Sequence, residues 1–310
     1  MFSDGRGGPP SFMNYYLLID SGSDYTWLQC EGAYPSFNQD APLYPSHGSY
    51  TYQPQRCGNP PEPDCIDGYR TRSQAYGNGA VADIVLAADK FTFNSSAFMI
   101  NMGCGFSQRN WDGVFCMNRQ RGRPDFIAGV LGLGTGPWSL VIQLQEVSQG
   151  KFSYCLEEFD DNFFPGLNTY LRFGSDAYIG GGGQLVHATP ILVPGLTTSL
   201  YFLALEDISV SNQKLRFRRG TFALRGPRNN RIGGTIIDSG APFSALRRDS
   251  FDRVAQFVEQ RFAQHGIDVL EENARYDFIF GAMQQVNKKI LYDLNVAQLF
   301  FADQVCTQDR

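Results

Sequence analysis

Apolar and polar positions along the chain follow the spacing of β-strands over most of its length. Runs rich in β-branched and aromatic residues occur at 15–19, 81–86, 90–93, 201–210 and 234–237, and such runs suit pleated sheets. The 33 glycines and the 14% of aromatic residues fit many short strands joined by tight turns. The pattern predicts an all-β protein, mainly strands with a few short helices.

Two segments show helical spacing instead. Segment 137–150 begins with proline, carries leucine and valine along one face and ends at glycine. Segment 249–266 begins at Asp249 or Ser250, either of which can cap a helix, and it repeats apolar residues at helical intervals until Gly266. Both segments are therefore predicted helices within a β-rich chain.

A run of four glycines at 180–183, followed by two prolines, predicts a flexible connection. A chain of 310 residues has room for two domains of ordinary size. We therefore expect an N-terminal lobe at 1–175 and a C-terminal lobe at 176–310.

A short tract occurs once in each expected lobe. Residues 17–23 read Leu-Leu-Ile-Asp-Ser-Gly-Ser, and residues 235–241 read Thr-Ile-Ile-Asp-Ser-Gly-Ala. A single copy would be ordinary turn chemistry at the end of a strand, but two copies indicate a duplicated half-domain that brings Asp20 and Asp238 to one axis. Two close carboxylates are the chemistry of acid–base peptide hydrolysis.

A second element follows each aspartate. The apolar run 127–134 passes through Gly132, and the apolar run 278–281 ends at Gly281. Either run alone would read as a buried strand with a bulge. As paired members of a repeat, they predict strands that pass so closely beside the aspartate turns that only a residue without Cβ fits.

Composition narrows the functional classes. The chain is 43% hydrophobic and 18% charged, which is typical of a folded, soluble protein. Its net charge of −5 gives no electrostatic reason to expect a nucleic-acid partner. The apolar runs are too short to cross a membrane.

Cysteine usage indicates the compartment. Six of the seven cysteines precede the second Asp-Ser-Gly, and Cys306 stands alone near the end. Because no two cysteines form a C-x-x-C pair and the three histidines are scattered singly, no metal site is expected. Six cysteines in one half favour an oxidising compartment and three disulfides, whose pairing the sequence leaves open. The first residues contain no apolar signal segment, so we expect an incomplete start.

Many ordered motifs resemble the pepsin-like aspartic proteases, particularly the plant branch that includes nepenthesin. The matching segments span nearly the whole chain and lie at 8–10, 16–30, 76–79, 103–105, 132–137, 151–156, 234–240, 279–281 and 291–294. The resemblance implies a bilobal fold with the active-site cleft between the lobes. It also implies an aspartic endopeptidase that acts as a monomer, needs no cofactor, takes an extended polypeptide as substrate and follows the secretory pathway to the extracellular space or the vacuole.

The resemblance assigns the chemistry to Asp20 and Asp238. Two carboxylates within hydrogen-bonding distance share one proton. The ionised member activates a water, and the protonated member donates to the peptide carbonyl. Ser21 and Ser239 would tie the two loops together beneath this dyad.

The same resemblance implies roles for the residues around the dyad. Gly22 and Gly240 would permit the tight loops and expose backbone groups to substrate. Ser23 would donate a hydrogen bond to Asp20, and its counterpart Ala241 cannot do so for Asp238. Because a lost donor disfavours the charged form, we expect Asp238 to be the more readily protonated member.

A flap is also implied. Tyr76 would close over the substrate, while Gly77 and Asn78 present backbone groups to the peptide. Trp27 matches the position whose indole N–H anchors the flap tyrosine. Without the family, Tyr76 would read as a turn aromatic and Trp27 as a core residue.

One departure from the family pattern concerns the second lobe. Gly132 lies far beyond Asp20, whereas Gly281 follows Asp238 at less than half that interval. In pepsin-like proteases the two intervals are much closer to one another. We therefore expect a second lobe shortened after about residue 265, with Cys306 left without a partner.

Other functional classes remain as alternatives. A catalytically impaired homologue that acts as a binding or inhibitor protein is one, as in the plant xylanase inhibitors that resemble pepsins. Those inhibitors typically lack a complete catalytic set, whereas both Asp-Ser-Gly loops and Tyr76 are present here. A serine hydrolase is remote because no Gly-x-Ser-x-Gly elbow occurs. A nucleotide site is also remote because the glycines at 131–136 lack a following Lys-Ser/Thr pair.

Overall fold

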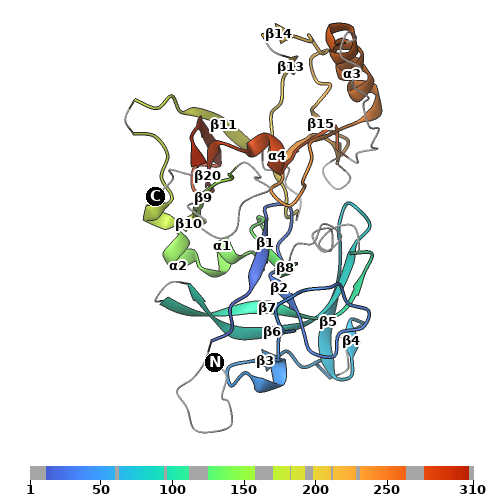
Figure 1. The fold of residues 1–310 in the computed structure, drawn as a ribbon, viewed down its shortest axis with the longest axis vertical. Coiled ribbons are helices and arrows are strands. Elements are labelled where there is room, and N and C mark those ends of the chain that lie inside the picture. Colours follow the sequence, from blue (N-terminus) through green and yellow to red (C-terminus); the bar gives the residue numbers. More distant parts are fainter. Residues whose placement is uncertain are drawn as a thin grey trace. The chain divides into compact units, whose positions relative to one another are not determined.

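The chain forms two compact units, drawn in Figure 1 from the computed structural model. The first comprises Met1–Ile19, Asp24–Leu133 and Pro137–Gln143, and the second comprises Asp20–Ser23, Gly134–Gly136 and Leu144–Arg310. The structure describes residues 12–59, 63–93, 96–111, 125–157, 170–181, 183–192, 198–210, 212–227, 231–262 and 276–306. The first Asp-Ser-Gly loop thus belongs to the second unit. Strands β9 (Lys151–Cys155) and β10 (Arg172–Phe173) also belong to it, although they precede residue 175.

The first unit is built on one sheet of eight strands in the order β1-β8-β2-β7-β6-β5-β4, with β3 paired to β6. Its elements are β1 (Tyr16–Asp20), β2 (Trp27–Gln29), the 3₁₀ turn Ser46–Gly48, β3 (Gln53–Pro54), β4 (Cys65–Ile66), β5 (Tyr69–Ala75), β6 (Val81–Phe93), β7 (Ser96–Arg109), β8 (Ile127–Gly132) and helix α1 (Leu140–Gln143).

Strand β6 is longer than the sequence predicts. The runs 81–86 and 90–93 belong to one strand that pairs with β7 along its length, with a bulge between Asp83 and Ile84. The polar Asp89 does not interrupt the strand although it is only 3% exposed. Its carboxylate accepts hydrogen bonds from the hydroxyls of Tyr44, Ser49 and Thr51, which satisfy the buried charge.

Aromatic rings fill the core of the first unit. The ring centroids of Trp27 and Trp111 lie 5.3 Å apart, edge to face, and Phe37 packs on both. At the end of β8, a Cβ on Gly132 would collide with the backbone of Asp24. The close passage expected at this glycine is therefore confirmed.

The second unit contains a sheet of nine strands in the order β10-β9-β20-β21-β11-β12-β17-β19-β18, and two small hairpins, β13-β14 and β15-β16. Its strands are β9 (Lys151–Cys155), β10 (Arg172–Phe173), β11 (His187–Leu192), β12 (Tyr201–Leu203), β13 (Ser209–Val210), β14 (Gln213–Lys214), β15 (Leu224–Arg225), β16 (Ile232–Gly233), β17 (Thr235–Ile237), β18 (Ala245–Leu246), β19 (Phe278–Phe280), β20 (Lys288–Asp293) and β21 (Gln298–Asp303).

Four buried aromatic rings pack together in this unit. Phe152 and Tyr292 lie parallel with centroids 4.3 Å apart, and Tyr201 meets Tyr292 edge to face at 4.6 Å. Tyr154 adjoins both Phe152 and Tyr292. Beside them, β17 and β19 pair in parallel, and a Cβ on Gly281 would collide with the backbone of Phe243. The second predicted close passage is therefore also confirmed.

The predicted helices occur with altered bounds. Segment 137–150 forms two short helices, α1 and α2 (Gln145–Ser148), separated at Leu144. Helix α3 (Arg248–Phe262) begins one residue before the expected cap, and the expected stop at Gly266 lies outside the described residues. A 3₁₀ turn (Gly174–Asp176) and α4 (Ala282–Gln285) complete the unit. Among the described residues, no helix is long and apolar enough to span a membrane.

The described residues form three disulfides: Cys30–Cys104, Cys57–Cys65 and Cys155–Cys306. The expectation that Cys306 lacks a partner was wrong. Strand β20 pairs with both β9 and β21, so the end of β9 and the residues after β21 lie close enough to be bridged. The expectation assigned Cys155 to the N-terminal lobe because Cys155 precedes residue 175, whereas the structure places it in the second unit with Cys306. Cys116 lies outside the described residues.

We predict that the Cys155–Cys306 bond stabilises the second unit by more than the Cys57–Cys65 bond stabilises the first. Its cysteines are 151 residues apart, against 8 for Cys57–Cys65. Loop-closure entropy then gives about 5 kcal/mol for the long loop and about 2.5 kcal/mol for the short one. Calorimetry on the double variants C155A/C306A and C57A/C65A measures both losses of unfolding free energy, and equal losses would contradict the prediction.

Candidate active site

The two Asp-Ser-Gly loops meet inside the second unit. Asp20 ends β1, and Asp238 directly follows β17. The backbone N–H of Ser21 donates to the hydroxyl of Ser239 at 3.0 Å, and the N–H of Ser239 donates to the hydroxyl of Ser21 at 2.9 Å. The two serines therefore cross-link the loops through a nearly symmetric pair of hydrogen bonds, as the sequence predicts.

Each loop glycine makes room for the opposite aspartate. The N–H of Gly22 donates to Asp20 Oδ1 at 2.9 Å, and the N–H of Gly240 donates to Asp238 Oδ1 at 2.8 Å. A Cβ on Gly22 would lie 2.5 Å from Asp238 Oδ2, and a Cβ on Gly240 would collide with the Asp20 carboxylate. Any larger residue would push the carboxylates apart, so glycine is required at both positions.

The environments of the two carboxylates differ despite the symmetric backbone. The hydroxyl of Ser23 donates to Asp20 Oδ2. Ala241 has no hydroxyl, but its backbone N–H donates to Asp238, as do those of Gly240 and Gly22. Asp238 thus depends on backbone donors, whereas Asp20 has a side-chain donor as well as the N–H of Gly22.

Burial raises the pKa of Asp20 to about 7, and the neighbouring charge of Asp238 adds to this rise. Burial also raises the pKa of Asp238, against the opposing effect of the Gly240 N–H and of a hydrogen bond from Asp20. Two such groups share one proton and titrate as a pair. The structure favours Asp20 as the member that holds it.

This assignment corrects the expectation that Asp238 is the more readily protonated member. Asp20 is only 5% exposed, whereas Asp238 is partly exposed. Desolvation disfavours the charged form more strongly at the deeper site. The expectation considered only the hydrogen bond from Ser23, which lowers the pKa of Asp20. Desolvation raises that pKa by more than the hydrogen bond lowers it.

The expected flap residues lie in the first unit. Trp27 Nε1 donates to the hydroxyl of Tyr76 at 2.7 Å, so the predicted anchoring bond is present. The turn between β5 and β6 is closed by the Tyr76 N–H, which donates to the carbonyl of Ala80, and by the Ala80 N–H, which donates to Asn78 Oδ1. Gly77 lies in this turn and is exposed.

Sequence reasoning missed three polar side chains behind the dyad. Gln285 Nε2 donates to the backbone carbonyl of Asp238 at 3.3 Å, and Tyr154 and Tyr292 continue from it as a buried hydrogen-bonded group. The sequence carries only a weak signal for these three side chains. The two tyrosines stand in β9 and β20, where an aromatic residue predicts only packing.

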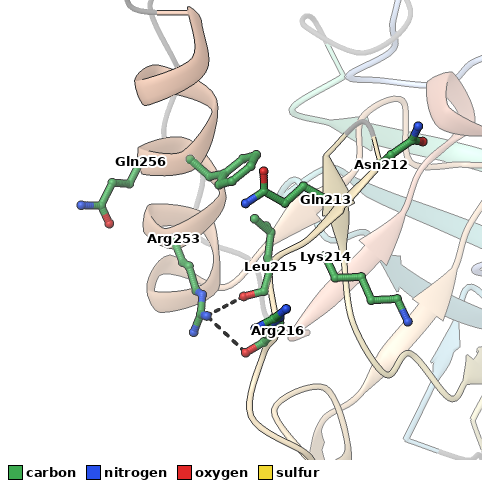
Figure 2. Close-up of a pocket in the computed structure, with 8 residues that line it drawn as sticks. Asn212, Gln213, Lys214, Leu215, Arg216, Arg253 and Gln256 are labelled. Atoms are coloured by element: carbon green, nitrogen blue, oxygen red, sulfur yellow. Dashed lines mark hydrogen bonds between the residues drawn. The ribbon is translucent and has the colours of Figure 1, made fainter.

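The described residues contain no cluster of three or more histidine, cysteine, aspartate or glutamate side chains that could hold a metal ion. A surface hollow of about 800 Å³ lies between the β13-β14 hairpin and α3 (Figure 2). Arg253 borders it and donates to the carbonyls of Leu215 and Arg216. Among the residues that the structure describes, none that lines this hollow carries a carboxylate.

Two family models match the sequence. The model described as Xylanase inhibitor N-terminal matches residues 6–175, which is more than half of the chain. The model described as Xylanase inhibitor C-terminal matches residues 200–278. The matched regions contain both Asp-Ser-Gly loops.

Similar proteins are plant aspartic proteinases. Aspartic proteinase nepenthesin-2 of Nepenthes gracilis is 29% identical over 82% of this chain and 54% of its own length. Aspartyl protease AED1 of Arabidopsis thaliana is 30% identical over 80% of this chain and 49% of its own length. The chain therefore spans about half the length of these curated relatives.

A solved structure supports the fold. The protein titled "Crystal structure of edgp" superposes with a TM-score of 0.61 and 14% identity, covering 95% of this chain and 91% of that one. At this identity the likeness shows the fold alone. With the family-model matches, the plant relatives and the mainly β architecture, the chain belongs to the pepsin-like aspartic protease family, in the plant branch that includes the nepenthesins.

Proposed function

We propose that this chain is an aspartic endopeptidase in which Asp20 and Asp238 hydrolyse peptide bonds through an activated water. The observation that carries the proposal is the pair of crossed loops. They hold two carboxylates in hydrogen-bonding contact, and burial raises the pKa of both. A protein that needed only a stable fold would gain nothing from such a costly arrangement.

The unequal burial and hydrogen bonding of the two carboxylates assign their roles. Asp238, held ionised by backbone donors, takes a proton from the bound water, whose oxygen attacks the carbonyl carbon of the peptide. Asp20, which holds the shared proton, donates it to the carbonyl oxygen. The tetrahedral intermediate then collapses as the C–N bond breaks. The nitrogen takes the proton that Asp238 had taken up, and one hydroxyl of the intermediate returns its proton to Asp20 as the carboxyl C=O forms.

The proposed substrate-binding residues belong to the Asp-Ser-Gly loops of the second unit and to the flap of the first. Gly22 and Gly240 present backbone groups beside the dyad. In the flap, Tyr76 would cover the peptide, and Gly77 and Asn78 would present backbone groups to it. Backbone groups of this kind bind an extended polypeptide as an added strand. The bond from Trp27 supports the role of Tyr76, because it fixes the tyrosine hydroxyl.

The three disulfides support a protein that matures in the secretory pathway, for the extracellular space or the vacuole. We propose a monomer that acts without a cofactor. In the proposed reaction one carboxylate activates the attacking water and passes the water's proton to the amine, and the other carboxyl group donates to the carbonyl oxygen.

The second candidate is a binding or inhibitor protein on the same fold. It is favoured by the description of the matching families as xylanase inhibitors. The dyad environment favours the protease. A binding protein has no use for a carboxyl group that keeps its proton to about pH 7.

Peptide cleavage tests the proposal directly. Purified wild type is assayed across about pH 3 to pH 6, with and without pepstatin, beside the variants D20N and D238N. Each variant should lose about a hundredfold to ten-thousandfold in kcat/KM, because each removes one proton-transfer partner. D303N, on an exposed side chain, is the matched control. Equal activity in all four proteins would exclude the proteolytic reading.

The pH dependence of the unfolding free energy should also report the protonation of Asp20. The pKa of Asp20 rises from 3.8 to about 7 on folding, so the folded state holds a proton that the unfolded state releases. The contribution of Asp20 to stability should therefore be greatest below about pH 4 and be lost as the pH rises to about 7. The D20N variant should lose most of this slope in urea denaturation. An unchanged slope would show that Asp20 is not protonated in the folded state.

Two donor changes should move opposite limbs of the pH–rate profile. S23A removes a donor that favours charged Asp20, so the alkaline limb of kcat/KM should move up by about one pH unit. A241S adds a hydroxyl beside Asp238 and should move the acid limb down. If S23A moved the acid limb instead, the assigned roles of the two aspartates would be reversed.

A further inference from the structure

A group of buried polar side chains lies behind Asp238 in the second unit. Gln285 is 0% exposed, Tyr154 is 2% exposed and Tyr292 is 0% exposed. Gln285 Nε2 donates to the carbonyls of Asp238 at 3.3 Å and Phe280 at 2.8 Å. The hydroxyl of Tyr154 lies 2.6 Å from Gln285 Oε1 and 3.0 Å from the hydroxyl of Tyr292.

The direction of each hydrogen bond follows from donor counting. Because the amide nitrogen of Gln285 faces two carbonyls, its oxygen faces Tyr154 and can only accept. Tyr154 must therefore donate its single proton to Gln285, and Tyr292 must donate its own to Tyr154. The hydroxyl of Ser21 is also bonded to Tyr292. Since the proton of Tyr292 is already used, Ser21 is the donor.

These bonds form a closed ring. Ser21 donates to Tyr292, Tyr292 to Tyr154, Tyr154 to Gln285, and Gln285 to the carbonyl of Asp238. The next N–H along the chain, that of Ser239, donates back to the hydroxyl of Ser21. The carbonyl of Asp238 and the N–H of Ser239 belong to one peptide unit. Both ends of that peptide are thus held by the same ring.

We propose that Tyr154, Gln285 and Tyr292 are positioning residues for the dyad, acting through the Asp238–Ser239 peptide. This inference rests on the proposed function. The ring fixes the plane of the peptide that follows Asp238 and so fixes the direction in which its carboxylate points. Within the ring each proton has one acceptor, so neither tyrosine hydroxyl can turn away without leaving a buried group unpaired.

The ring stays intact across the working pH range. Burial raises the pKa of Tyr154 and of Tyr292 above the ordinary tyrosine value, and the charge of Asp238 adds to both effects. Both hydroxyls therefore remain neutral donors while the dyad titrates. The ring differs in this respect from a proton relay, because it orients the dyad and exchanges no charge with it.

The variants Y154F and Q285M test the ring in the full chain. Each keeps the buried volume and removes one link. A displacement of the Asp238 carboxylate by a fraction of an ångström should lower kcat about tenfold, with KM within about twofold of wild type, because no substrate contact is removed. The double variant should lose no more kcat than the worse single variant, since a ring broken once is already open.

Y44F is the matched control, because it removes a buried and bonded tyrosine hydroxyl in the first unit. It should lower stability and leave kcat unchanged. A fall in kcat as large as that of Y154F would show a general effect of destabilisation and would overturn the proposal. Additive losses in the double variant would overturn it equally.

Hydrogen exchange at the Ser239 amide gives a readout that does not depend on catalysis. Opening the ring in Y154F should accelerate this exchange about tenfold or more relative to Y44F. If wild type cleaves no peptide but the exchange is accelerated, the ring stands and the proposed function fails. If wild type is active and Y154F alters neither kcat nor exchange, the function stands and the ring fails.

Discussion

The crossed hydrogen bonds between Ser21 and Ser239 are the constraint on which the second unit depends. They bring two carboxylates to a place where water solvates neither well, and where two negative charges would repel. A single shared proton relieves both problems. The arrangement is destabilising for the fold above acidic pH and is kept in place by bonds from backbone and serine groups. Structure and chemistry therefore depend on the same few atoms.

The two Asp-Ser-Gly loops are symmetric in their backbone hydrogen bonds, but their carboxylates have different surroundings. The two loops bond to each other and to their own carboxylates with nearly equal distances. Asp20 is the more deeply buried member, and Asp238 receives backbone donors. Unequal burial within a symmetric backbone gives two chemically identical residues different surroundings. In the proposed function, this inequality separates the acid from the base.

The sheet of the second unit supports the dyad from behind. Strands β9 and β20 are neighbours, and they place Tyr154 and Tyr292 against each other at the centre of the unit. Gln285 enters from α4, between β19 and β20. The Cys155–Cys306 bond joins β9 to the residues beyond β21. The same strands that close the core thus hold the polar ring behind Asp238.

Local sequence was enough to predict the features that local geometry imposes. These are the strands that stop at Asp-Ser-Gly and the glycines Gly132 and Gly281, which must lack a Cβ. The bond from Trp27 to Tyr76 joins residues far apart in the chain and was expected only from the family resemblance. The partner of Cys306, the proton on Asp20 and the ring through Gln285 were decided only by the tertiary structure. Each depends on burial or on the pairing of strands far apart in the chain, and desolvation and long-range pairing leave no local pattern in the sequence.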